Sequence, residues 1–180
     1  LRATVRKGLL ETKLGIPLRT PAEGHNIAFT SLWDNYPDSL QIPLQGKASR
    51  AYLLMAGSTN HMQCHIDNGV IRVYYEDGTC DTLSLVNPDN WPPIEQIFFE
   101  DGKSFNRHAP SLYRLRLKTG ELSNNFGEEL GFTGVSREVD GGAAVLLEMS
   151  LNAGKKLSHL VLETLSNEVV IGIMGITLQR

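Results

Sequence analysis

The stretch VIRVYYEDGTCDTLSLV, residues 70–86, decides the fold class of this chain. In both of its halves, 70–76 and 79–86, apolar and polar side chains alternate with a period of two, which is typical of a half-buried strand. Between the halves stands Asp77-Gly78, a pair that accepts the positive φ angles of a tight hairpin turn. The stretch therefore predicts an antiparallel β-hairpin.

The register of this hairpin follows from which side chains can be buried. If Ile71 and Val73 face the core, Leu83 and Leu85 of the second strand face it with them, and Arg72 points to solvent. A slip by one residue would turn every side chain to the other face and bury the guanidinium. We therefore expect the register that keeps Arg72 outside.

The same alternation recurs along most of the chain, separated by turn signals. Further pairs suited to tight turns are Asn68-Gly69, Thr119-Gly120 and Gly141-Gly142. No window of useful length has a convincing helical period, so the sequence predicts an all-β chain, an antiparallel two-sheet β-sandwich. The expected strands are Asn26 to Trp33, Ser39 to Leu44, Ala48 to Met55, Met62 to Ile66, Val70 to Glu76, Thr79 to Val86, Ser111 to Leu117, Ala143 to Leu151, Leu157 to Leu165 and Glu168 to Leu178.

The last of these segments is apolar on nearly every side, through Val169, Ile171, Ile173 and Ile176. A strand that is covered on both faces loses its polar alternation. We therefore expect it at the centre of a sheet.

Composition limits the number of domains and the class of partner. With 180 residues, 41% of them hydrophobic, one compact domain is expected over residues 21–180, and residues 1–20 are predicted to be an extension or linker from an upstream domain. The net charge is -3 and basic residues do not cluster, so neither a nucleic acid nor an anionic membrane is an expected partner. The apolar stretches are much shorter than the ~20 residues that span a bilayer, so no membrane insertion is expected.

The segment His61-Met62-Gln63-Cys64-His65 offers two imidazoles and a thiol, which are ligands for zinc. On a strand, however, residues four apart are separated by roughly 13 Å, and Cys64 would point to the opposite face. We therefore favour a strand that buries Met62, Cys64 and Ile66 over a metal site. We expect Cys64 and Cys80 to be buried free thiols; the alternative is a disulfide, which would require their strands to lie side by side.

Two other segments have the composition of binding loops on a β scaffold, because each combines aromatic, proline and amide or carboxyl side chains. A flat ring stacks on the apolar face of a sugar, and the polar groups bind its hydroxyls. The alternative is that both segments are structural corners, with Trp33 and Trp91 packed inside. The candidate ligand-binding residues are Trp33, Asp34, Asn35, Tyr36 and Asp38 in the first segment, and Asn90, Trp91, Glu95 and Gln96 in the second.

Carboxylates near turns allow a third interpretation, because glycoside hydrolysis needs two carboxyl groups about 5 to 10 Å apart. Common enzyme motifs such as G-x-S-x-G, H-E-x-x-H, the P-loop and the Rossmann glycines are absent from the sequence. Most carboxylates in loops are solvated or act in turns, so no catalytic residue is predicted. The carboxylates considered are Asp34, Asp38, Asp77, Asp81, Glu95, Glu100 and Asp101.

The block TSLWDNYPDSLQIPLQGKASRAYLLMAGSTNHMQ, together with VYYEDGT, NPDNWPPIEQ and VVIGIMGITLQ, resembles a C-terminal β domain of unknown function attached to glycoside hydrolases of gut Bacteroidota. The pattern is also similar to galactose-binding-like jelly rolls appended to polysaccharide-degrading enzymes. The resemblance covers roughly residues 21–180. It implies a sandwich fold, a periplasmic or extracellular parent enzyme and a catalytic domain upstream, but it supplies no binding residue.

Two functions follow as expectations. The first is a non-catalytic accessory domain that binds carbohydrate through these loops, with no cofactor except a structural Ca²⁺ held by loop oxygens. The second is a structural module that packs against the catalytic domain of the same chain. An exposed aromatic residue over a polar groove would favour the first, whereas burial of Trp33 and Trp91 and an apolar patch elsewhere would favour the second.

Overall fold

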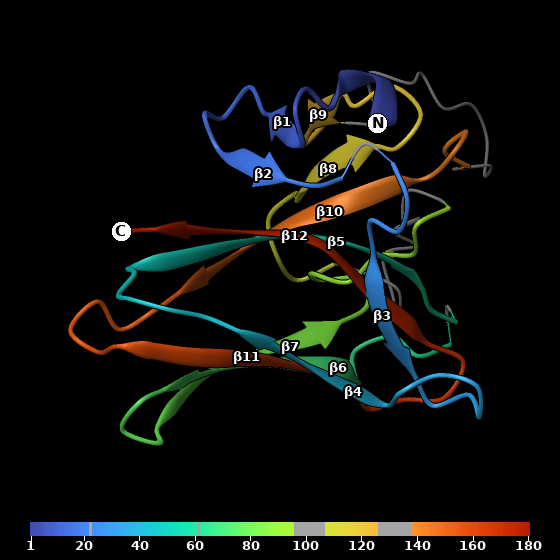
Figure 1. The fold of residues 1–180 in the computed structure, drawn as a ribbon. Helices are drawn as coiled ribbons and strands as arrows, with labels where there is room; N and C mark the ends of the chain where they lie inside the picture. Colours follow the sequence, from blue (N-terminus) through green and yellow to red (C-terminus); the bar gives the residue numbers. More distant parts are fainter. Residues whose placement is uncertain (22, 61, 96–106, 126–137) are drawn as a thin grey trace.

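The computed structural model describes residues 1–180 apart from 22, 61, 96–106 and 126–137. One short 3-10 helix, Arg2–Thr4, precedes a series of strands joined by turns and loops (Figure 1). The strands are β1 (Leu9–Glu11), β2 (Pro17–Arg19), β3 (Ala28–Ser31), β4 (Ser39–Pro43), β5 (Arg50–Ser58), β6 (Asp67–Tyr75), β7 (Cys80–Val86), β8 (Tyr113–Arg116), β9 (Leu122–Ser123), β10 (Ala143–Ser150), β11 (Leu157–Thr164) and β12 (Val170–Gln179).

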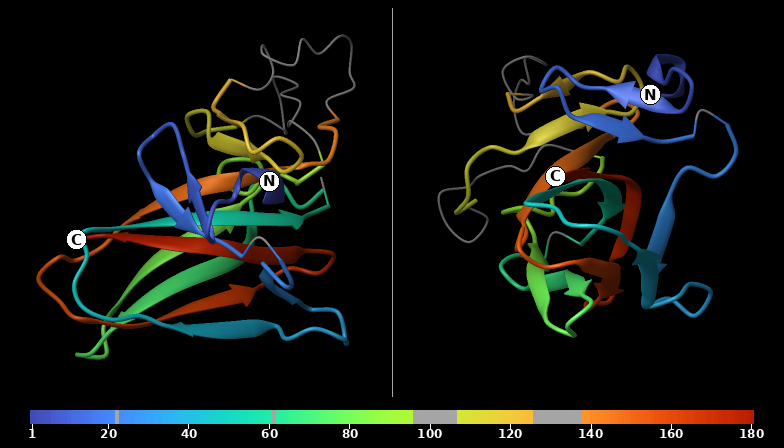
Figure 2. Two further views of the ribbon diagram at one scale, coloured as in Figure 1. Left: turned by 45° about the horizontal axis from the view of Figure 1, so that its top comes forward. Right: turned by 60° about the vertical axis from the view of Figure 1, so that its left-hand side comes forward.

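The strands form two main sheets that pack face to face (Figure 2). One sheet has six strands in the order β3-β12-β5-β10-β8-β9, and the other has four in the order β4-β11-β6-β7. The antiparallel pairs are nested: β3 pairs with β12, β4 with β11, β5 with β10, and β6 with β7. The chain thus resembles a long hairpin folded into two layers, which is the strand order of a jelly roll. The predicted fold class is confirmed.

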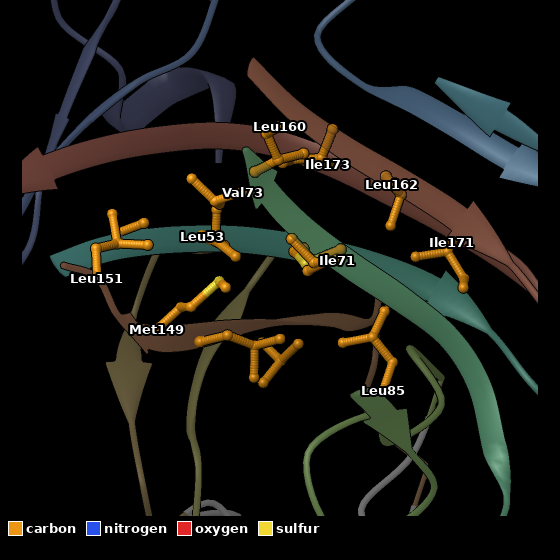
Figure 3. Packing of buried hydrophobic residues seen from close by; sticks show 14 of the residues in the cluster. Leu53, Ile71, Val73, Leu85, Met149, Leu151, Leu160, Leu162, Ile171 and Ile173 are labelled. Carbon is orange, nitrogen blue, oxygen red and sulfur yellow. The ribbon is translucent and has the colours of Figure 1, made fainter. Parts of the chain in front are cut away.

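The core lies between the two sheets and is built from aliphatic side chains of both (Figure 3). Leu53 and Ile171 of the six-stranded sheet meet Ile71, Leu160 and Leu162 of the four-stranded sheet, and all five are fully buried. Alternate residues of each strand point inward, so the period-two pattern of the sequence becomes the inner face of the sandwich.

The central strands β5 and β10 are buried on both faces. Their second face, which includes Leu54 and Leu146, is covered by the β1–β2 hairpin through Leu10 and Leu18. This packing explains why AYLLMA and AAVLL are continuously apolar instead of alternating. Residues 1–20, which we predicted to be an extension or linker, are therefore folded onto the outer face of the six-stranded sheet.

The hairpin that decided the fold class has the predicted register. Ile71 lies opposite Leu83, and Arg72 lies opposite Thr82 on the outer face. Gly78 closes the turn with a φ of 83°, which is the left-handed conformation that glycine adopts without steric cost. The prediction for β12 is also confirmed, because this strand lies between β3 and β5 inside the larger sheet.

One predicted strand is wrong. Met62 to Ile66 forms a turn with a single bridge at Cys64, and Met62 and Ile66 are exposed instead of buried. The cause is Asn68, which is not a turn residue as predicted but lies fully buried in β6. Its side-chain amide donates to the carbonyls of Gln63 and Ile66 at 3.0 and 3.1 Å, which holds the preceding residues in a loop.

The cysteines are free, as expected, but they are not buried in the core. Cys64 is half-buried and Cys80 is exposed. Among the described residues, no helix has both the length and the hydropathy that crossing a membrane would require.

Candidate functional site

One end of the sandwich gathers the loops that carry most of the candidate residues, because nested antiparallel pairs bring the ends of many strands to the same edge (Figure 1). The loop 165–169 between β11 and β12 joins its neighbours there. Its Glu168 accepts a hydrogen bond of 2.5 Å from Asn60 of the β5–β6 loop, and its Val169 carbonyl accepts one of 2.8 Å from Ser31 at the end of β3. Three loops therefore form one connected surface.

The β3–β4 loop, residues 32–38, is a compact turn fixed at both ends by backbone hydrogen bonds. Tyr36 N–H donates to the Trp33 carbonyl at 3.0 Å, and Ser31 N–H donates to the Pro37 carbonyl at 3.0 Å. The Asp38 carbonyl accepts from Thr164 N–H at 2.9 Å, which anchors the loop to β11. The side chains of this loop are thus displayed on a rigid scaffold.

Two aromatic rings stand on this loop. Trp33 is 52% exposed and Tyr36 is 40% exposed. Their ring centroids are 6.4 Å apart, and the Tyr36 ring makes an edge contact of 5.0 Å with Phe29 of β3. The alternative that Trp33 packs inside the sandwich is wrong, because half of its side chain faces solvent.

Polar groups accompany the two rings. Asp34, Asn35 and Asp38 are exposed on the same loop. Within the described part of the chain, no hydrogen bond engages the side chains of Asp34 or Asn35. Their carboxylate and amide groups are therefore available to donors and acceptors of a ligand.

The second predicted segment, residues 90–96, is built differently. The Asn90 side chain binds the end of β7: its amide oxygen accepts from Val86 N–H at 2.7 Å, and its amide nitrogen donates to the Ser84 carbonyl at 2.8 Å. Trp91 is 1% exposed and belongs to the core. Its indole lies against Gly57, where an added Cβ would come within 2.7 Å of the ring. The prediction that Trp91 presents a ring to a ligand is therefore corrected: this ring is core.

Arg114 on β8 anchors this second segment to the six-stranded sheet. It is not among the residues predicted from the sequence. Its buried guanidinium donates to the carbonyls of Pro93 at 2.8 Å and Ala143 at 2.7 Å. Burial lowers the pKa of Arg114 to about 10, an effect that nearby Glu95 partly opposes. In sequence, Arg114 is one of several basic residues in YRLRLK, and nothing there distinguishes a buried arginine from an exposed one.

The two predicted segments do not make one site. Among the described residues, no hydrogen bond, ion pair or ring contact joins residues 33–38 to residues 90–95. Glu95 is exposed, and Gln96 lies outside the described residues. The candidate carbohydrate site is therefore the β3–β4 loop alone.

The carboxylates considered for catalysis are dispersed. Asp77 and Asp81 lie near the β6–β7 turn, at the opposite end of the sandwich from Asp34 and Asp38. The Lys155 ammonium, 2.8 Å away, and Thr79 lower the pKa of Asp77 to about 2. Glu100 and Asp101 lie outside the described residues.

Burial and a hydrogen bond to Asp81 raise the pKa of Tyr75 to about 12. The Tyr75 hydroxyl also accepts from Asn152 N–H at 2.7 Å. These contacts tie the β6–β7 turn to the β10–β11 turn, so the two shifted groups have a structural explanation.

A hollow of about 560 Å³ lies between the N-terminal segment and the outer face of the six-stranded sheet. Ile27, Ile94 and Met174 are among the apolar residues that line it. Its described lining includes Arg2 and Lys118 but no carboxylate.

No protein-family model, curated protein or solved structure matches this chain. The fold class therefore rests on the strand order, and the function is argued from the geometry of the loops.

Proposed function

We propose that this chain is a non-catalytic accessory β-sandwich domain that binds carbohydrate through the β3–β4 loop. The observation that carries the proposal is the exposed pair of rings, Trp33 and Tyr36, with Asp34 and Asn35 between them in the chain. An indole face takes the apolar C–H face of a sugar ring, and adjacent carboxylate and amide groups bind its hydroxyls.

Rigidity of the loop supports the same proposal. A loop that is already ordered loses little conformational entropy when a ligand binds, so even a small contact area retains useful affinity. The anchors of this loop at Ser31 and Asp38 are backbone hydrogen bonds and do not involve either ring. Ligand binding needs no rearrangement of the sandwich.

The wider context is part of the proposal. Following the resemblance to C-terminal domains of glycoside hydrolases, we propose that the domain belongs to a polysaccharide-degrading enzyme of the periplasm or the cell exterior. The domain then holds the enzyme near its polymer, while a separate catalytic domain cleaves it. A structural Ca²⁺ bound by loop oxygens stays a prediction, tested by unfolding with and without a calcium chelator.

The second candidate function, packing against the catalytic domain, is favoured by a different observation. Met62 and Ile66 on the β5–β6 loop and Leu165 after β11 are exposed at the same end of the sandwich as Leu32 and Trp33. Exposed apolar side chains that gather on one face are typical of an interface. The catalytic domain would then cover this end.

A glycan-binding screen separates these functions. We expect the chain to bind one class of plant or host polysaccharide, with affinity reduced at least about tenfold in Trp33→Ala and Tyr36→Ala. Both variants should unfold close to the wild-type temperature, because both side chains lie at the surface and outside the core. Tyr74→Ala, a half-buried ring on β6 that stacks on His159, is the matched control and should bind normally.

The interface function predicts a different pattern. In the full-length enzyme, Met62→Lys and Ile66→Lys should increase hydrogen exchange of residues 62–68, because the catalytic domain would otherwise protect them. If the chain binds no glycan and these two variants change exchange as described, the interface function is correct and the carbohydrate proposal fails.

A further inference from the structure

Two histidines and one aspartate converge at the loop end of the sandwich, on residues that the proposed function does not use. Each of His65, Asp89 and His108 offers one ligand atom, and the three atoms lie within 4.8 Å of one another. His108 Nδ1 is 3.7 Å from Asp89 Oδ2, and the two imidazole rings have centroids 4.5 Å apart with an interplanar angle of 30°. Side chains from two separate connections therefore face a common point.

The backbone holds these side chains in place. His65 has a φ of 57°, a left-handed conformation, and its N–H donates to the Asn87 carbonyl at 2.8 Å. Asp89 follows two residues later, and its Oδ1 accepts from His108 N–H at 2.6 Å. The backbone of His65 is thus bound to the segment that carries Asp89, and the backbone of His108 is bound to Asp89 itself.

Buried amides support both connections. Asn68 fixes the loop around His65 through the Gln63 and Ile66 carbonyls, and its own Oδ1 accepts from Thr59 at 2.6 Å. Asn90, which follows Asp89, is fixed to the end of β7 through Ser84 and Val86. Ligands whose neighbours are already ordered make a preorganised site.

We propose that His65, Asp89 and His108 bind one divalent transition-metal ion of the Zn²⁺ class. Two imidazole nitrogens and a carboxylate oxygen suit zinc and its neighbours, whereas Ca²⁺ and Mg²⁺ prefer oxygen alone. In a tetrahedral site with bonds of about 2.1 Å, ligand atoms are about 3.4 Å apart. The separations here, 3.7 Å for the His108–Asp89 pair and at most 4.8 Å for any pair, exceed that value by at most about 1.4 Å, which side-chain rotations can remove.

The ion would have two consequences. It would join the β5–β6 loop to the β7–β8 connection, and so stabilise the loop end of the folded state by mass action. Three protein ligands would also leave a fourth position for water or for an oxygen atom of a bound molecule. Since His65 and His108 are both exposed, that position is open to solvent.

From the sequence alone, His61, Cys64 and His65 are the candidate ligands, and strand geometry disfavours a metal site among them. The structure groups His65 with residues that are 24 and 43 positions away in the chain. The Cys64 sulfur accepts a contact of 3.5 Å from the Asn87 amide, and His61 lies outside the described residues. Local spacing could not reveal this cluster, because it depends on how β6 and β7 pair.

The test is calorimetric titration of the chelator-stripped chain with Zn²⁺, with Co²⁺ absorption as a report on the ligand geometry. The site variants are His65→Asn, which tolerates the left-handed backbone, Asp89→Asn, which keeps an acceptor for His108 N–H, and His108→Gln. His25→Gln, an exposed histidine of the N-terminal region, is the matched control. Thermal unfolding without metal verifies that each variant folds.

We expect one Zn²⁺ per chain in the wild type and in His25→Gln, and affinity at least about tenfold weaker in each of the three site variants. Wild-type affinity in His108→Gln would overturn the proposal, as would the absence of Zn²⁺ binding at millimolar concentration. Loss of binding in Cys64→Ser or His61→Ala, with full binding in Asp89→Asn, would assign the ion to the local box and equally overturn it.

Discussion

At the scale of single residues, the space around Trp91 shows how tightly this end of the core is packed. Gly57 lies in β5, and an added Cβ would come within 1.9 Å of the Val170 carbonyl oxygen and 2.7 Å of the Trp91 ring. A backbone oxygen cannot rotate away as a side chain can. Glycine is therefore required here for close approach, not for a turn.

We expect Gly57→Ala to lower the free energy of unfolding by about 3 kcal/mol, the upper end of the range for overpacking a core. Urea denaturation followed by circular dichroism measures it. Gly154→Ala is the control, since its nearest neighbour is the Asn152 side chain at 3.2 Å. Equal stability of the two variants would mean that Trp91 and β12 are not packed as described.

Arg114 provides a second prediction at this scale. Replacing it by Met leaves the Pro93 and Ala143 carbonyls without their donor, and hydrogen bonds to a charged group are worth about 1.5 to 3 kcal/mol. We expect Arg114→Met to cost about 2 to 3 kcal/mol in chemical denaturation. Arg116→Met, which loses a partly exposed pairing with Glu121 at 3.5 Å, should cost less than about 1 kcal/mol. The reverse order would contradict the structural role of Arg114.

At the scale of elements, the alternation of apolar and polar residues predicted most of the strands that pair in the two main sheets. All but one of the predicted strands are present, because hydrophobic side chains at every second position can be buried only as strands. The exception, Met62 to Ile66, alternates as well, but the buried side chain of Asn68 competes for its backbone carbonyls. Such competition depends on the burial of a distant residue and is invisible in a short window.

The sequence also could not predict which of the two tryptophans is buried. Both stand in similar aromatic and proline-rich segments, yet Trp33 is exposed and Trp91 is core. The difference arises from the strands that each segment connects. Residues 32–38 join β3 and β4, which are edge strands of the two sheets, whereas Trp91 follows β7 and packs against Gly57. Residue type predicted that these loops matter, but topology decides which of them can meet a ligand.

The β6–β7 turn gives a prediction of pH dependence. The folded pKa of Asp77 is about 2 against an ordinary 3.8, so its contribution to stability is present above pH 3.8 and is lost as the pH falls toward 2. We expect Asp77→Asn, which keeps the Oδ1 acceptor of the turn, to be slightly less stable than the wild type at pH 6, and we expect most of this difference to be gone at pH 2, the folded pKa.

Denaturant unfolding at several pH values measures this difference. Lys155→Gln is the control, because in its background the Asp77 substitution should have a smaller effect at pH 6. A stability difference that stays constant from pH 6 to pH 2 would show that the charge of Asp77 contributes nothing.

At the scale of the whole molecule, the β1–β2 hairpin adds a third layer to the two sheets of the jelly roll, because it covers the outer face of the larger sheet (Figure 2). Leu18 of this hairpin is fully buried. If the hairpin belongs to the same cooperative unit, Leu18→Ala should lower the free energy of unfolding by about 2 to 5 kcal/mol. Leu14→Ala, at a residue that is 38% exposed, should change it by less than about 0.5 kcal/mol.

Thermal unfolding observed by both tryptophan fluorescence and circular dichroism distinguishes the alternatives. A single transition that shifts downward in Leu18→Ala supports one folding unit. An unchanged main transition would mean that residues 1–20 are an independent extension, as the sequence alone predicted.

The central claim is that the exposed ring of Trp33 contacts a carbohydrate, and the chain contains an internal reference for testing it, since its other tryptophan, Trp91, is buried. The measurement is iodide quenching of fluorescence as the polysaccharide selected in the binding screen is added. We predict that the ligand protects the wild type from quenching, while Trp33→Phe, which retains only Trp91, shows little quenching and weaker binding. Ligand binding that leaves the quenching of Trp33 unchanged, or a screen in which no glycan binds, would contradict the account.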